Sequence, residues 1–212
     1  MKSQIKNLAF PLVWEMLFVI FCIIRPFKTL YIFFVFYLVL TVYFAKDFSF
    51  KDYFANFKDV KKFWIPVVIT MVGAILAFLA NKNLILPSFS DVLNDGTFDF
   101  TWENSYMGEF LRAATILFMR PIAEELFFRK AVMNFDSAAS AILTFSLGLV
   151  LCGLSHAYLP LGMVEYIVMA LPLAAAFFCT RNIYVPITVN VCFMMYQYLP
   201  EIIYDVARIS MR

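Results

Sequence analysis

Long apolar runs, separated by short polar or charged clusters, make up most of this chain. Each run approaches the roughly 20 apolar residues that a helix needs to cross the hydrocarbon core of a membrane. The pattern predicts about seven such helices, at residues 8–24, 29–45, 63–80, 105–122, 138–156, 164–180 and 183–199. We therefore expect an all-α fold, in which a polytopic bundle of transmembrane helices forms one membrane domain.

Residues 46–62 follow a different pattern, which predicts a helix lying in the membrane interface. Phe50, Phe54 and Phe57 recur at helical spacing, with Lys and Asp residues between them. Such an amphipathic helix buries its apolar face among the headgroups and keeps its charges in water. Ser49 is placed to cap it. A solvated connector is the alternative interpretation of these residues.

Residues 81–104 contain Pro, Gly and several acidic residues, which are typical of a loop outside the membrane. The first part of the chain, residues 1–104, is thus expected to combine transmembrane helices, the interfacial helix and this loop. No motif in this loop indicates a particular ligand.

Composition agrees with a membrane protein and argues against a nucleic-acid partner. Hydrophobic residues make up 63% of the chain and charged residues 15%, whereas about a quarter of the residues are charged in a typical soluble domain. A net charge of +2 is too small to indicate nucleic-acid binding. With the N-terminus inside, ten Lys and Arg residues fall in inner segments and five in outer ones, which favours this orientation.

The cysteines indicate no disulfide framework. Cys22, Cys152, Cys179 and Cys192 all lie in apolar runs rather than in polar loops. We expect all of them to be reduced and to act as small buried residues.

A cluster of charges interrupts the apolar pattern in the segment "AEELFFRK". Ionisable groups at membrane depth are costly, so they are candidates for function. Glu125 and Arg129 stand four residues apart and can pair on one helical face. Glu124 is rotated about 100° from Glu125 and can face another part of the site. The alternative is a helix end, where these charges reach the headgroups.

Two polar residues later in the chain strengthen the functional interpretation. His156 is the single histidine and ends an apolar run. Beside a carboxylate it can deprotonate a water or bind a metal, although a packed, hydrogen-bonded histidine is the alternative. Cys152 shares its helical face and is a nucleophile candidate, or a packed residue. Asn190, in the middle of a span, needs partners and is also explained by interhelical hydrogen bonding.

Three motifs resemble those of the CAAX protease and bacteriocin-processing family, the intramembrane proteases also called the Abi family. "PIAEELFFRK" is similar to the family motif E-E-x-x-x-R. "CGLSHA" is similar to F-x-x-x-H, with Cys152 at the Phe position. "NIYVPITVNVCFM" resembles the apolar third motif that ends in H-x-x-x-N. The resemblance covers about residues 105–199, with the motifs in the expected order.

The resemblance implies a helical bundle with a cavity open to the membrane, in which an activated water attacks a peptide carbonyl. Carried over, Glu124 is the base, with Glu125 and Arg129 as its supporting pair. His156 is the first histidine of the site. Asn190 stands where the family has its second histidine, and Met194 stands where it has the final Asn.

The resemblance also implies a divalent metal such as zinc. Its ligands would be Glu124, His156 and Asn190. An amide oxygen is a poor ligand for zinc beside imidazole or thiolate, so a site without a metal is the alternative.

Taken together, the resemblance implies an intramembrane endopeptidase that cuts a membrane-associated peptide or protein, for example a prenylated one. We expect a multi-pass protein of the bacterial cytoplasmic membrane, in contact with lipid. Residues 105–199 would form the protease core and residues 200–212 a C-terminal tail. The altered third motif leaves a second interpretation open, a non-catalytic relative with a binding, regulatory or bacteriocin-immunity role. A transporter is less favoured, because no inverted repeat is visible.

Overall fold

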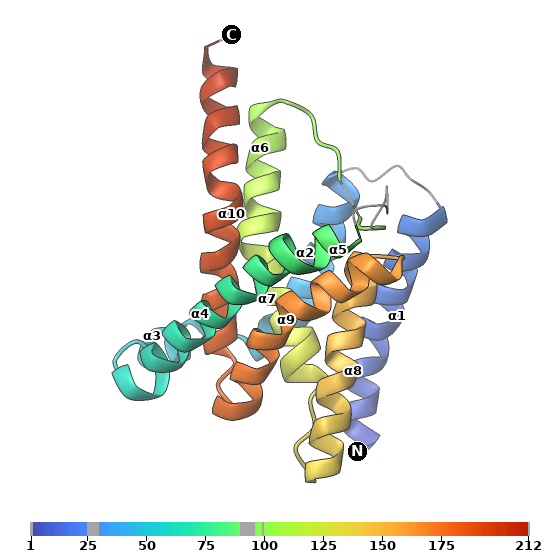
Figure 1. Ribbon diagram of the computed structural model, residues 1–212, viewed down its shortest axis with the longest axis vertical. Coiled ribbons are helices and arrows are strands. Elements are labelled where there is room, and N and C mark those ends of the chain that lie inside the picture. The colour runs from blue at the N-terminus through green and yellow to red at the C-terminus, as the bar shows by residue number, and fades with distance from the viewer. Residues whose placement is uncertain (1, 25–29, 90–95, 99, 212) are drawn as a thin grey trace.

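The protein is an all-α membrane helical bundle (Figure 1). The computed structural model describes residues 2–24, 30–89, 96–98 and 100–211, and it describes side chains from Leu8 onward. Of the described residues, 85% are helical. The long α-helices are α1 (Lys2–Ile24), α2 (Leu30–Phe44), α4 (Ile65–Ala80), α8 (Ala138–His156), α9 (Pro160–Thr180) and α10 (Tyr184–Ser210).

Four helical segments of the described residues are long and apolar enough to cross a membrane. They are Leu30–Asp47, Val60–Ser88, Ala138–His156 and Pro160–Thr180, and Leu8–Ile24 is a shorter apolar helix. The membrane bundle expected from the hydropathy pattern is therefore confirmed, while the number of about seven spans stays a prediction.

The segment expected in the membrane interface, residues 46–62, forms a shorter helix than predicted. A 3₁₀ turn, Ala45–Asp47, precedes α3 (Phe50–Asn56). Ser49 caps α3 as expected, because its Oγ accepts a hydrogen bond from the Asp52 amide at 3.3 Å. The helix ends early because Asp59 caps a new wide-turn segment, Val60–Trp64, through the Lys62 amide. The amphipathic run is thus divided between two helical pieces.

Two segments that the sequence places outside helices continue the preceding helix instead. Residues 81–88 were expected in a loop, yet they extend α4 through Asn81–Ile85 and α5 (Leu86–Ser88). Their backbone groups pair within the chain, as an apolar surrounding requires. Residues 200–212 were expected as a tail, but α10 runs on to Ser210. Asp205 is buried there, which explains why this end stays ordered against its neighbour.

The helix that carries the charged motif is longer and less regular than residues 105–122 predict. It begins with α6 (Tyr106–Ala113) and continues through a π-helical segment, Ala114–Met119, into α7 (Arg120–Glu124). A second π-helical segment, Glu125–Ala131, ends it. Pro121 lies in the first turn of α7, where its missing N–H is accommodated by the wide turn before it. These two π-helical segments, whose turns are wider than those of an α-helix, lie before and after Glu124 in the sequence.

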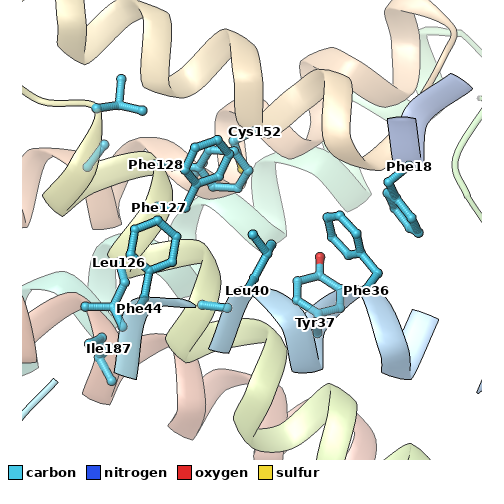
Figure 2. Close-up of a cluster of buried hydrophobic side chains, with 14 of the residues drawn as sticks. Phe18, Phe36, Tyr37, Leu40, Phe44, Leu126, Phe127, Phe128, Cys152 and Ile187 are labelled. Atoms are coloured by element: carbon cyan, nitrogen blue, oxygen red, sulfur yellow. The ribbon is translucent and has the colours of Figure 1, made fainter. Parts of the chain in front are cut away.

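An aromatic core holds α1, α2, α8 and the motif helix together (Figure 2). The rings of Phe18 and Phe36 stack with their centroids 3.9 Å apart. Phe127 and Phe128, which lie between Glu125 and Arg129 in the charged motif, are almost fully buried in the same core. The motif helix therefore contributes both aromatic core residues and buried charges.

The cysteines are free, as predicted, but only two of them are buried. Cys22 and Cys152 lie in the core, whereas Cys179 and Cys192 are exposed. The expectation of four buried cysteines is therefore wrong for the last two. A small apolar side chain on the outside of a membrane bundle faces lipid, so its exposure carries little penalty.

The remaining helices surround the motif helix. α6 and α10 run side by side toward the C-terminus, α8 packs against both α1 and α9, and α4 packs against α9 and α10 (Figure 1). Val185 and Val189 of α10 are fully buried in a second apolar cluster with Phe63. This arrangement leaves room among α4, α9, α10 and the motif helix.

Candidate functional site

Glu124 is the centre of a buried polar group. Its Oε1 atom accepts hydrogen bonds from the Tyr37 hydroxyl at 2.6 Å and from Arg120 Nε at 2.9 Å. His156 Nε2 lies 2.9 Å from the same oxygen. Among the described residues, the second carboxylate oxygen, Oε2, has no hydrogen-bond partner. One oxygen is thus fixed by the protein and the other is available.

The contacts of His156 constrain its hydrogens. Nδ1 lies 2.7 Å from the Cys152 carbonyl oxygen, which only accepts hydrogen bonds, so Nδ1 carries a hydrogen. When Nε2 also carries a hydrogen, it donates to Glu124 Oε1, and the pair is a carboxylate and an imidazolium.

The His156 ring is also held by an aromatic neighbour and by the backbone. Tyr166 of α9 stacks on it, with ring centroids 4.2 Å apart and an interplanar angle of 22°. The His156 carbonyl accepts a hydrogen bond from the Phe98 amide at 2.8 Å. Next to it, an isolated antiparallel bridge joins Thr97 to Ala157. We call residues 96–98 the strap, because this segment crosses the end of α8.

Glu125, Arg129 and Asn190 form a second group beside the first. Arg129 Nε lies 3.2 Å from Glu125 Oε2, so the pair predicted from the four-residue spacing is present. Arg129 also donates to the Ala170 carbonyl of α9 at 3.3 Å. Asn190 Nδ2 donates to Glu125 Oε1 at 2.9 Å. Because the Asn190 amide nitrogen donates to Glu125, the side-chain oxygen of Asn190 is the atom that can accept a hydrogen bond from another group.

A cavity of about 390 Å³ lies among α4, α9, α10 and the motif helix and brings most of the predicted site together. Glu124, Arg129, His156 and Asn190, four of the site residues named from the sequence, all line it. Glu125 is fully buried behind it. The other walls are largely apolar and include Ala74, Phe78, Leu86, Met169, Leu173, Val189, Phe193 and Met194.

Several residues that contact Glu124 or His156 were not assigned to the site from the sequence. Arg120 stands four residues before Glu124, the same spacing that revealed the pair of Glu125 and Arg129, so it was detectable. Tyr37 and Tyr166 are ordinary aromatic residues of apolar helices, and only the fold places them here. Cys152 contacts His156 through its carbonyl oxygen, and its side chain is buried.

The donor set fits a zinc centre poorly. Protein zinc sites usually have three or four His, Cys or carboxylate ligands, and the described residues contain no group of three such side chains that could hold a metal. Arg120 places a positive charge on Glu124 Oε1, where a cation would otherwise bind. Zinc stays a prediction from the resemblance, and the chemistry below is derived without it.

A separate buried charge cluster lies farther along the motif helix. Arg112 is 2% exposed and lies 2.8 Å from Glu201 and 3.3 Å from Asp205, both on α10. The Arg112 guanidinium also stacks over the Trp102 ring at 3.8 Å. Trp102 Nε1 donates to Glu109 Oε1 at 2.9 Å. These contacts tie α6 to α10 and have no residue in common with the cavity.

The comparisons with known proteins agree with the motif analysis. Residues 106–195 match the family model described as "Type II CAAX prenyl endopeptidase Rce1-like". This range contains both carboxylates, Arg120, His156 and Asn190, and it excludes Tyr37 and the strap. The resemblance inferred from the three motifs is thereby confirmed. Neither the curated proteins nor the solved structures gave a match.

Proposed function

We propose that this protein is a membrane-embedded peptidase, and the match of residues 106–195 to the Rce1-like type II CAAX prenyl endopeptidase model supports this proposal. Its substrate would be a membrane-associated peptide or protein of the CAAX type, which carries a prenyl group. The observation that carries the proposal is the direct contact of Glu124 with His156 at the wall of an apolar cavity. Apolar walls suit a lipidated chain, and a carboxylate–imidazole pair suits hydrolysis.

The contacts suggest a division of roles during hydrolysis. Oε2 of Glu124 takes a proton from a water in the cavity while the water oxygen attacks the peptide carbonyl carbon. The His156 imidazolium then gives its Nε2 proton to the leaving amine as the carbon–nitrogen bond breaks. The proton on Glu124 Oε2 then leaves to water in the cavity and His156 takes up one proton, which restores the pair. Arg120 favours the charged form of Glu124 before each turnover.

The neighbouring group has a supporting role in this scheme. Glu125 and Arg129 pair and connect the motif helix to α9 through the Ala170 carbonyl. Asn190 donates to Glu125 and so connects α10 to the same helix. These contacts hold the backbone that carries Glu124, and none of these residues exchanges a proton with substrate.

Substitution of Glu124 tests the proposal. The purified protein in liposomes would be given a farnesylated peptide with a fluorophore and a quencher on either side of the scissile bond. Glu124→Gln keeps the size of the side chain and removes the base, so the rate should fall by about 10²–10⁴. The control is Glu103→Gln, which changes an exposed carboxylate before α6. Equal rates for wild type and Glu124→Gln would rule the mechanism out.

A second function is favoured by one specific observation. Asn190 and Met194 replace the His and Asn of the third motif, so fewer groups are available to activate water. A non-catalytic relative would bind a membrane peptide and act as a regulatory or bacteriocin-immunity protein. The same liposome preparation distinguishes the two, because such a protein would bind the farnesylated peptide without cleaving it.

We further infer a setting in the bacterial cytoplasmic membrane with the N-terminus inside. The excess of Lys and Arg in the inner segments supports this orientation. Lipid and a membrane-associated substrate are the partners expected, with no role for nucleic acid. Proteolysis of a tag on the N-terminus in sealed inverted vesicles would check the orientation, since only an inside terminus is cut.

A further inference from the structure

One contact in the site comes from a helix that the matched family segment does not include. Tyr37 lies on α2, and its hydroxyl is 2.6 Å from Glu124 Oε1. The side chain is 2% exposed, so water does not compete for this hydrogen bond. A hydroxyl has a single hydrogen, and a carboxylate that also accepts from Arg120 receives it. Tyr37 therefore donates to Glu124.

The position of this hydroxyl is fixed by its own neighbours. The Tyr37 ring meets Phe33 edge-on, with centroids 4.8 Å apart and an interplanar angle of 81°. The Phe36 ring is also edge-on to the Tyr37 ring, with centroids 5.0 Å apart and an interplanar angle of 79°. Figure 2 shows Tyr37 between Leu40 and Phe36 of α2, with its oxygen pointing away from the backbone of that helix. The ring cannot turn away without disturbing this packing.

We propose that Tyr37 is a positioning residue that holds the Glu124 carboxylate in its working orientation. This inference rests on the proposed peptidase function. The terminal bond of a Glu side chain rotates in a broad, two-fold well, so its two oxygens exchange places readily unless donors distinguish them. Arg120 and His156 donate from two directions, and Tyr37 supplies the third from a different helix. With all three on Oε1, Oε2 is kept for the attacking water.

A purely structural role for this hydrogen bond gives a different outcome. An interhelical tie between α2 and α7 would change stability and leave the turnover of folded enzyme unchanged. A positioning role lowers kcat, because misplacement of a base by a fraction of an ångström reduces the rate even when substrate binds normally. The ratio of kcat to KM effects therefore separates the two roles.

The first experiment compares Tyr37→Phe with Tyr31→Phe in the farnesylated-peptide assay. Tyr31 lies on the same helix and is exposed, so it is the matched control. Tyr37→Phe should lower kcat by about 10- to 100-fold, with KM changed by less than about twofold. Tyr31→Phe should behave as wild type. An unchanged kcat in Tyr37→Phe would overturn the proposal.

A second experiment works without any activity. His156 is the chain's single histidine, so ¹⁵N-histidine labelling gives one imidazole signal in detergent. Loss of the Tyr37 donor leaves more charge on Oε1 and strengthens its bond to Nε2, so the Nε2 and Hε2 shifts should move in Tyr37→Phe. Glu124→Gln gives the reference for a lost carboxylate. Unchanged shifts in Tyr37→Phe would overturn the positioning role. If the shifts move in Tyr37→Phe but the wild-type protein cleaves no peptide, only the peptidase function would be overturned.

Discussion

Glu124 remains charged inside an apolar bundle because three donors from three helices converge on one of its oxygens. Burial of an isolated carboxylate carries a large penalty, and hydrogen bonds with an opposite charge offset it. Arg120 supplies that charge from one turn earlier in the same helix. The cluster is therefore both a candidate for chemistry and a condition for stability.

Removal of Arg120 should destabilise the fold. Arg120→Ala leaves Glu124 and Tyr37 in place but takes away the compensating charge, at a cost of about 3–5 kcal/mol. Thermal unfolding in detergent would measure the change. Arg120→Lys keeps a charge and should lose less. If Arg120→Ala unfolds at the wild-type temperature, His156 alone compensates Glu124.

Removal of Arg129 tests the second pair in the same way. Arg129→Ala leaves the fully buried Glu125 with Asn190 as its hydrogen-bond donor, so we expect a loss of about 3–5 kcal/mol and a lower unfolding temperature. Lys130→Ala is the neighbouring control, because Lys130 is half-exposed and lies 3.7 Å from Asp47. That surface pair should contribute less than about 1 kcal/mol. Equal losses for the two variants would contradict the burial of the Glu125 pair.

At the scale of elements, the strap shows how a short connection can fix a catalytic candidate. Gly96 has a φ of 75°, in the left-handed region that other residues rarely adopt. Its carbonyl accepts from the Tyr158 amide at 3.0 Å, and a Cβ there would lie 2.5 Å from the Leu159 Cβ. Only glycine therefore lets the strap lie so close to the residues after His156.

Gly96→Ala should loosen this contact. The positive φ and the clash with Leu159 together predict a loss of about 1–3 kcal/mol and faster hydrogen exchange at the Phe98 and Tyr158 amides. Gly73→Ala is the control, since its Cβ would meet Pro172 at a milder 3.2 Å. Exchange in Gly96→Ala as slow as in wild type would show that the strap tolerates a side chain.

The sequence predicted the helices better than their ends. Apolar runs specify that a helix forms, because backbone groups in lipid must pair internally. Their limits depend on contacts that no local pattern contains, such as the pairing of Asp205 with Arg112 beyond the expected end of α10. At the site, the charges that interrupt an apolar run pointed to Glu124, Glu125 and Arg129, and the single histidine of the chain pointed to His156. Tyr37 depended on the packing of α2 and could not be predicted.

At the scale of the whole molecule, two buried charge groups lie along one helix. The cavity group joins the motif helix to α2, α8, α9 and α10, and the Arg112 cluster joins α6 to the far part of α10. Figure 1 shows these two helices extending together toward the C-terminus. The end of α10, as far as Ser210, is thus part of the fold.

Truncation of residues 200–212 should therefore be harmful. It removes both Glu201 and Asp205 and leaves Arg112 buried with Glu109 as its ion-pair partner among the described residues. We expect a loss of about 3–5 kcal/mol, seen as a lower unfolding temperature and yield. A chain ending at Ala207 keeps both carboxylates and is the control. Equal stability of the two truncated chains would show that the cluster contributes little.

The two wide turns of the motif helix have a consequence for chain length. A helical residue advances the side-chain direction by about 100°, and a wide turn accommodates one residue more than a regular turn. Deletion of one residue between Ala114 and Met119 would therefore rotate Arg120 and Glu124 relative to α8 without altering either of them. A relative with a one-residue gap in this segment would keep the E-E-x-x-x-R motif, but its first carboxylate would no longer face the histidine. The number of residues between α6 and the motif is therefore as informative as the motif itself.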